Sequence, residues 1–130
     1  MKTDKADKWF SIFIRLRDSD ENGNVKCCTC QITRNWKQLD CGHWIKRQHQ
    51  TTRFNEYNCS GQCKGCNAFE QGRPIEHEKF IIKKYGERIR NILKAGERQT
   101  CKRSKFDLEY IAKEYELKAK EIAINKGLSI

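Results

Sequence analysis

The sequence predicts a small α+β domain, with helices at both ends and a cysteine-stapled region of short strands and loops between them. Its 130 residues suit one domain. Only 37% are hydrophobic while 34% are charged, so the core is expected to be small and to need disulfides or a bound metal ion for stability. Helical periodicity occurs near both ends, and two Cys-x-x-Cys pairs lie in the middle.

The first helix is expected over residues 5–17. Large apolar residues between Trp9 and Ile14 recur at helical spacing, and the turn formers of residues 18–24 close the helix. Residues 25–72 are rich in Cys, Gly, Asn and Thr and show few helical repeats. This composition predicts short strands and loops around a metal ion.

Residues 73–130 return to helical periodicity and are expected to form a basic helical arm of the same domain, 1–130. The Pro and Gly residues and the apolar spacing predict three helices. The first begins at Pro74 and ends at Gly86, the second ends near Gly96, and the third runs from about Leu108 to Gly127. The apolar stripe of the last helix indicates packing against the core or a partner rather than catalysis.

The chain carries 27 basic and 17 acidic residues, a formal charge of +10. This surplus points to a polyanion, with nucleic acid as the first candidate and an anionic membrane surface as the second. Residues 79–105 hold ten basic and two acidic residues, so the charge is local. No secretory leader and no apolar run of about 18 residues occur, and we expect a cytoplasmic protein that does not cross a membrane.

Eight cysteines in a reducing compartment favour metal binding over disulfides. The two pairs predict a closed structural zinc site of four thiolates, from Cys27, Cys30, Cys63 and Cys66. A redox role is weaker, because no βαβ pattern surrounds either pair. Cys28 would be a poorer ligand than Cys27. The remaining cysteines, Cys41, Cys59 and Cys101, are interpreted as ordinary packed thiols.

The 32 residues between Cys30 and Cys63 exceed the roughly 15–20 of a simple zinc ribbon, so the insert is where chemistry is expected. It contains the motifs Asp40-Cys41-Gly42-His43-Trp44-Ile45 and Arg53-Phe54-Asn55-Glu56-Tyr57-Asn58, followed by Gln62-Cys63-Lys64-Gly65-Cys66-Asn67. The order His, Asn, Asn between two zinc knuckles resembles an HNH nuclease in its HNN variant. That resemblance implies a treble-clef, or ββα-metal, finger.

The resemblance narrows to the phage recombination family NinG/Rap over about residues 8–95. The matching motifs are Gly42-His43-Trp44-Ile45, Thr52-Arg53-Phe54-Asn55-Glu56-x-Asn58, Gln62-Cys63 with Cys66-Asn67, and Ile82-Lys83-Lys84-Tyr85-Gly86. The family is associated with nuclease action on branched DNA, including Holliday junctions and D-loops. The resemblance implies a phage or prophage protein working in a bacterial host.

Phosphodiester cleavage needs a base for water and a hard cation on the phosphate. His43 is the candidate general base, because imidazole titrates near neutral pH. Asn58 is expected to orient the His43 ring, and Asn67 to bind Mg²⁺ or Mn²⁺ through its carbonyl oxygen. The usual HNH spacing before the second knuckle favours Asn58 over Asn55, which is interpreted as a turn or cap residue.

Two positions depart from the pattern. The residue before the HNH histidine is usually an acidic or histidine ligand, but here it is Gly42, so Asp40 on the same strand face is the candidate carboxylate. His49 is an alternative ligand. NinG-like sequences often carry His where this chain has Ser60, which puts metal or phosphate binding there in question.

Basic residues are expected to bind DNA phosphates with little sequence readout. Near the predicted site these are Lys46, Arg47 and Arg53, and in the basic segment they include Lys83, Lys84, Arg88, Arg90 and Lys94. Trp44 and Tyr57 are expected to close the small core rather than to contact bases.

Together with the resemblance, these features predict a zinc-bound, Mg²⁺- or Mn²⁺-dependent HNH endonuclease of phage recombination that acts on double-stranded or branched DNA. A homodimer joined through the last helix would suit the two-fold symmetry of a four-way junction. The alternatives are an HNH endonuclease that nicks linear duplex, a non-catalytic zinc-finger DNA-binding module and, least favoured, a zinc redox protein.

Overall fold

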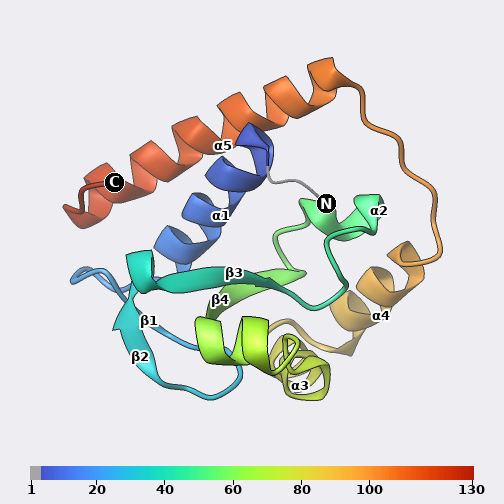
Figure 1. The fold of residues 1–130 in the computed structure, drawn as a ribbon, viewed down its shortest axis with the longest axis horizontal. Coiled ribbons are helices and arrows are strands. Elements are labelled where there is room, and N and C mark those ends of the chain that lie inside the picture. The colour runs from blue at the N-terminus through green and yellow to red at the C-terminus, as the bar shows by residue number, and fades with distance from the viewer. Residues whose placement is uncertain (1–3) are drawn as a thin grey trace.

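The computed structural model describes residues 4–130 (Figure 1). Two small antiparallel sheets and a short helix lie between longer helices toward the two ends of the described chain. The elements are α1 (Lys5–Asp18), β1 (Asn24–Lys26), β2 (Thr33–Asn35), β3 (Leu39–His43), α2 (Gln50–Arg53), β4 (Cys59–Cys63), α3 (Pro74–Tyr85), α4 (Glu87–Gly96) and α5 (Lys105–Lys126). A 3₁₀ turn covers Trp36–Gln38 and a π-helical turn covers Gly65–Phe69. The predicted small α+β class is confirmed.

Helix α1 forms where the apolar spacing predicted it. Asp4 caps its first turn by accepting from the Asp7 amide at 2.9 Å, and the Asp7 carboxylate accepts from the Asp4 amide at 3.2 Å. The apolar face buries Phe10, Ile14 and Leu16 almost completely. This face covers the β3–β4 sheet and forms one side of the main core.

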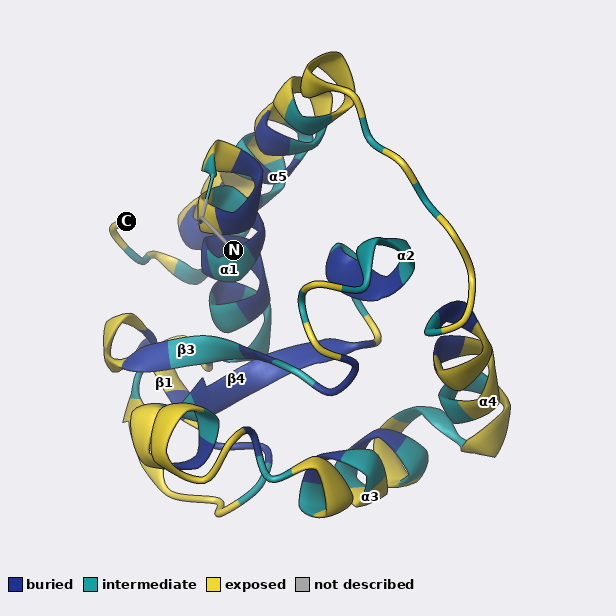
Figure 2. Cartoon of the chain, turned by 45° about the vertical axis from the view of Figure 1, so that its right-hand side comes forward, coloured by how far each residue is buried: buried dark blue, intermediate teal, exposed yellow. Residues whose placement is uncertain are grey.

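The β3–β4 hairpin is the centre of the molecule. Its register pairs His43 with Cys59 and Gly42 with Ser60. Because side chains alternate across a strand, Cys41, His43 and Cys59 share one face of the sheet. Figure 2 shows that much of both strands is buried between the surrounding helices.

Helix α5 runs along α1 (Figure 1) and places Tyr115, Ala119 and Ala123 in the main core. The predicted packing role of its apolar stripe is thus confirmed. The helix therefore belongs to the body of the domain and does not extend as a separate arm. It begins at Lys105, three residues earlier than expected, because Ser104 and Asp107 form a capping box.

The other helices begin and end at the predicted Pro and Gly residues. Pro74 occupies the first turn of α3, which ends at Gly86, and α4 ends at Gly96. Gly127 closes α5 in the left-handed conformation, at φ 69°, where a side chain would be strained. A second small core joins these helices to the chain after β3 through Trp44, Ile45, Ile81 and Leu93.

Trp44 is buried in this core as predicted, whereas Tyr57 is 46% exposed and stacks edge-on against Tyr85. None of the helices formed by residues 4–130 is long and apolar enough to span a bilayer.

Candidate functional site

The two cysteine pairs meet, as their spacing predicted. The sulfur atoms of the four cysteines all lie within 4.8 Å of one another: Cys27, Cys30, Cys63 and Cys66. The Cys63 amide donates to the Cys27 sulfur at 3.3 Å, and the Cys66 amide donates to the Cys63 sulfur at 3.4 Å. Such amides stabilise thiolates, and four sulfurs in a tight cluster fit a tetrahedral zinc ion. The cluster can therefore hold a structural metal.

Cys28 lies beside this cluster and is not one of its four members. Its side chain hydrogen-bonds to Cys27, and this contact, with amide donors from Cys30 and Cys63, lowers the pKa of Cys27. Cys27 is thereby prepared to ligate as a thiolate. The preference for Cys27 over Cys28 as a ligand agrees with this arrangement.

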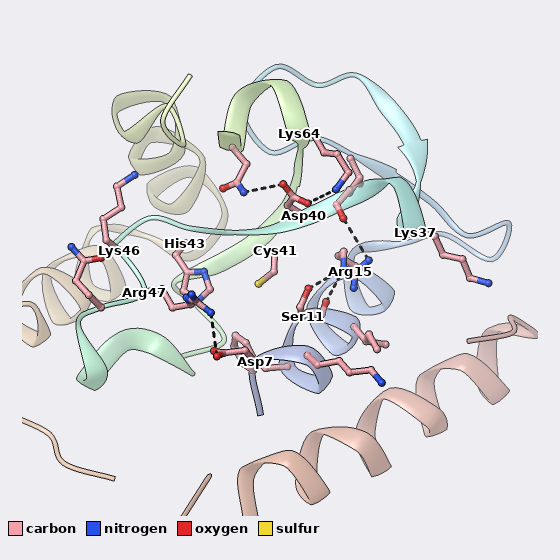
Figure 3. Close-up of a pocket in the computed structure, with 16 residues that line it drawn as sticks. Asp7, Ser11, Arg15, Lys37, Asp40, Cys41, His43, Lys46, Arg47 and Lys64 are labelled. Carbon is pink, nitrogen blue, oxygen red and sulfur yellow. Dashed lines mark hydrogen bonds and ion pairs between the residues drawn. The ribbon is translucent and has the colours of Figure 1, made fainter. Parts of the chain in front are cut away.

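A pocket of about 740 Å³ lies between α1 and the β3–β4 hairpin (Figure 3). Three of the predicted site residues line it together: Asp40, His43 and Asn67. Asp40 and His43 come from β3, and Asn67 comes from the π-helical turn that follows β4. The opposite wall is α1, which contributes Asp7, Ser11 and Arg15.

The His43 ring is held by a main-chain contact. Its Nε2 atom lies 3.0 Å from the carbonyl oxygen of Arg53. Because a carbonyl oxygen can only accept, Nε2 carries the hydrogen and the Nδ1 atom of a neutral ring keeps its lone pair. Burial lowers the pKa of His43, which keeps the ring neutral near pH 7. This state is the one that a general base requires.

Asn58 does not orient His43 directly, so that prediction is wrong. Its side chain is fully buried, accepts from the Ile45 amide at 2.8 Å, and donates to the carbonyl oxygens of Ile45 at 3.0 Å and Thr52 at 3.2 Å. These bonds tie together the loop between β3 and β4. Since Thr52 precedes Arg53, Asn58 fixes the segment whose carbonyl oxygen holds His43. Asn55 accepts from the Tyr57 amide at 2.9 Å, which is the expected turn role.

Asp40 and Asn67 are in direct contact. The Asn67 Nδ2 atom donates to Asp40 Oδ2 at 3.0 Å, and the Lys64 ammonium pairs with Asp40 Oδ1 at 2.7 Å. Figure 3 shows Asp40 and Lys64 across the β3 strand from Cys41 and His43. Carboxylate and amide oxygens are the donors that Mg²⁺ and Mn²⁺ prefer. Asp40 and Asn67 thus carry oxygen donors of this kind, and in the structure both oxygens of Asp40 accept hydrogen bonds from Lys64 and Asn67.

The structure explains the glycine before His43. A Cβ atom on Gly42 would lie 2.3 Å from Oε1 and 2.9 Å from Cβ of the buried Gln62, so a side chain there would displace Gln62. The nearest carboxylate on β3 is then Asp40.

Ser60, the second position that departs from the family pattern, is fully buried on the same sheet face as Gly42. It is not among the described residues that line the pocket. His49, the alternative ligand, lies at the start of α2 and also outside the pocket lining.

Arg53 is not available to DNA, contrary to the prediction. It is 5% exposed, and its guanidinium pairs with Asp7 through Nε at 2.9 Å and through a second, short contact from Nη2. Although burial acts in the opposite direction, the hydrogen bond and charge of Arg53 lower the pKa of Asp7. Arg47 also pairs with Asp7, at 3.2 Å, and lines the pocket together with Lys46.

The other predicted DNA-binding residues lie on α3 and α4. Lys83 and Lys84 line a second pocket, of about 930 Å³, whose described lining shares no residue with the first. Arg88 and Lys94 are exposed, Lys94 pairs with Glu97 at 2.9 Å, and Arg90 pairs with Glu78 at 2.6 Å. The basic segment is thus a separate surface from the wall around His43.

Sequence reasoning missed four basic residues that line the pocket: Lys8, Arg15, Lys37 and Lys64. A signal was available for two of them. Lys8, Ser11 and Arg15 recur at helical spacing on the polar side of α1, opposite the apolar stripe. It also missed that Cys41 and Cys59 lie beside His43, with ligand atoms of all three within 4.8 Å.

Comparison with curated proteins and with solved structures found no match. A family model does match, and it covers more of the chain than the motifs suggested, because it extends beyond residue 95 into α5. The motifs around His43 and the second cysteine pair lie inside the matched range. With residues 2–125 matched, the chain belongs to the family described as Bacteriophage Lambda NinG protein.

Proposed function

We propose that this protein is a metal-dependent endonuclease of phage DNA recombination, with His43 as its general base. The observation that carries the proposal is that His43, Asp40 and Asn67 line one pocket, in which the Arg53 carbonyl oxygen holds Nε2 of His43 and Asn67 contacts Asp40. Membership of the NinG family suggests a role related to phage recombination. The β3–β4 hairpin and the helical turn after it support an HNH-type, ββα-metal arrangement.

In this proposal, Nδ1 of His43 accepts a proton from the water that attacks the phosphate. Asp40 and Asn67 bind Mg²⁺ or Mn²⁺, after a half-turn of the Asn67 amide brings its oxygen toward the position that Nδ2 now occupies. When bound, the cation stabilises negative charge on the phosphate and the leaving oxygen. The Lys64 ammonium, now paired with Asp40, is then released to contact DNA.

The structural zinc ion would fix the frame of the site. Cys66 immediately precedes Asn67, and Cys63 ends the strand that pairs with β3. A zinc ion held by the four cysteines therefore fixes the π-helical turn relative to Asp40. This is a positioning role, because the four sulfurs close the coordination shell of the ion.

DNA contact would come from two surfaces. Lys8, Lys37, Lys46, Arg47 and Lys64 surround the His43 pocket, and the basic segment of α3 and α4 supplies further phosphate contacts. Such contacts carry little base readout, which suits an enzyme that selects DNA by branch geometry. Two copies would suit paired cuts in a two-fold symmetric junction.

The proposal is tested with synthetic four-way junctions and with linear duplexes of the same arms, in Mg²⁺ or Mn²⁺. We expect junction cleavage, and a loss of at least about 100-fold in His43→Ala. His49→Ala is the matched control, because this histidine lies outside the pocket lining. Equal cleavage by His43→Ala and the parent protein, at equal zinc content, would refute the base assignment. Preferred nicking of the linear duplex would favour a general HNH endonuclease.

One observation favours a second candidate function, a non-catalytic DNA-binding module. Both carboxylate oxygens of Asp40 are already occupied, by Lys64 and by Asn67. If no cation displaces them, the chain binds DNA without cutting it. Mn²⁺ titration of the protein, followed by water-proton relaxation, separates the two, because only the endonuclease needs a cation site that Asp40→Ala removes.

A further inference from the structure

We propose that Cys41, His43 and Cys59 form a second zinc site, distinct from the four-cysteine cluster. We further infer that zinc at this site inhibits the enzyme, because it occupies the His43 nitrogen needed as a base. The second statement rests on the proposed nuclease function, whereas the first stands on geometry alone.

The β3–β4 register brings the three ligands together. Cys41 and His43 are two residues apart on β3, and Cys59 is the direct cross-strand partner of His43. Side chains at these positions point to the same face of the sheet. Their ligand atoms lie within 4.8 Å of one another, the limit that the four-cysteine cluster also meets. Tetrahedral zinc needs about 3.5–3.8 Å between such atoms, given Zn–S and Zn–N bonds of about 2.3 and 2.0 Å.

The hydrogen bond of His43 prepares its ring for metal binding. Metal-ligating histidines usually donate their other ring N–H to a carbonyl oxygen or carboxylate, which fixes the tautomer and the ring plane. His43 makes this contact with the Arg53 carbonyl oxygen at 3.0 Å. The Nδ1 atom is then the nitrogen that can ligate.

The site has an entry path and an open coordination position. Cys41 and His43 line the pocket, so an ion arriving from solvent meets them first, whereas Cys59 is fully buried behind them. The Asp7 carboxylate on the opposite wall is engaged by Arg47 and Arg53. Water from the pocket would therefore complete a Cys₂His set, an arrangement known for zinc with three protein ligands.

Ligand chemistry separates the two ions of the pocket. Thiolates and imidazole select zinc, whereas the oxygen donors of Asp40 and Asn67 select Mg²⁺ or Mn²⁺. Zinc would bind His43 as a ligand, whereas cleavage with Mg²⁺ or Mn²⁺ would use His43 as the general base. Zinc and catalysis therefore compete for one nitrogen atom.

The metal content of the purified full chain, under reducing conditions, tests the site without any activity measurement. We expect two zinc ions per chain in the parent protein after saturation with zinc and dialysis, and one in Cys41→Ala. Cys101→Ala is the matched control, because Cys101 is half-buried and belongs to neither cluster of the described chain. A parent protein that saturates at one zinc ion would overturn the proposal, as would a second ion that persists in Cys41→Ala.

Substitution with Co²⁺ gives a second measurement that does not depend on the stability of a variant. Its absorption distinguishes a Cys₂His site from a Cys₄ site, and we expect the Cys₂His bands only with the second equivalent. A mass lower by about 2 Da in the parent protein, but absent in Cys41→Ala, would show a Cys41–Cys59 disulfide and overturn the site.

Cleavage assays then test inhibition. Micromolar zinc should reduce Mg²⁺-dependent cleavage by the parent protein at least about tenfold, while the ratio of rates with and without zinc should stay near one in Cys41→Ala. Equal inhibition of both proteins would overturn the inhibitory role. If no protein cleaves DNA at all, the nuclease proposal fails, but zinc content still decides the metal site.

Discussion

The Nε2 atom of His43 lies 3.0 Å from the carbonyl oxygen of Arg53, ten residues further along the chain. This contact joins the end of β3 to the end of α2 across the loop between them. It sets the tautomer of the ring, and it depends on a backbone position that other residues must hold in place.

Asn58 is the residue that holds this loop, so Asn58→Ala should weaken both stability and cleavage. The substitution leaves the Ile45 amide without its acceptor and two carbonyl oxygens without a donor in the interior. We expect the free energy of unfolding to fall by about 2–3 kcal/mol in urea titrations. Asn55→Ala, which removes one exposed turn contact, should cost under about 1 kcal/mol. Equal stability of the two variants would contradict this role for Asn58.

The buried ion pair of Arg53 predicts a second stability effect. Arg53→Ala leaves Asp7 buried without its main partner, which should lower the free energy of unfolding by about 3–5 kcal/mol. Lys120→Ala is the control, since it removes an exposed helical pair with Glu116 and should change stability far less. If Arg53→Ala instead leaves stability unchanged and weakens DNA binding, the original assignment of Arg53 to DNA is restored.

His77 predicts how stability depends on pH. It is fully buried, and neither ring nitrogen has a hydrogen-bond partner among the described residues, so burial lowers its pKa from 6.5 to about 4. Below pH 6.5 the unfolded chain therefore binds a proton that the folded chain does not. The free energy of unfolding should fall by up to about 1.4 kcal/mol per pH unit as the pH drops through this window.

His77→Phe removes this titration while keeping an aromatic ring near Phe80. Denaturant titrations between pH 7 and 4 should give a flatter curve for this variant than for the parent protein. His49→Gln, which removes a half-exposed histidine outside this buried site, is the control variant in the same titrations. A slope that survives in His77→Phe would assign it to other groups.

The basic segment predicts a measurable salt effect on DNA binding. If Lys83 and Arg88 each contact a phosphate, replacement by Gln should reduce the slope of log K against log salt by about one unit per residue. Both residues are exposed in the structure. Lys113→Gln is the control, because it lies on α5, outside the basic segment. Fluorescence anisotropy at several salt concentrations provides the measurement, and an unchanged slope would place DNA elsewhere.

Much of the fold was predictable because local signals set it. Helical spacing, Pro74, Gly86 and Gly127 fix where helices begin and end, and the Cys-x-x-Cys turns each aim two sulfurs at one ion. The pocket residues Asp40, His43 and Asn67 were found through a motif. These features depend on neighbours in sequence.

What was missed depends on partners distant in sequence. The engagement of Arg53 by Asp7 joins residues 46 positions apart, and no spacing rule reveals it. The cluster of Cys41, His43 and Cys59 exists only in the observed strand register, because a slip of one residue would move Cys59 to the other face. The contacts of Asn58 likewise follow from the folded loop rather than from its motif.

The pairing of α1 with α5 has a consequence for the order of folding during synthesis. The aromatic rings of Phe10 and Tyr115 meet edge to face, with centroids 4.9 Å apart, although 104 residues separate them in sequence. A nascent chain that has emerged only as far as residue 104 still exposes the apolar face of α1 that α5 later covers. Such late, long-range closure slows folding, so a translational pause before α5 would prolong exposure of that face to chaperones or proteases.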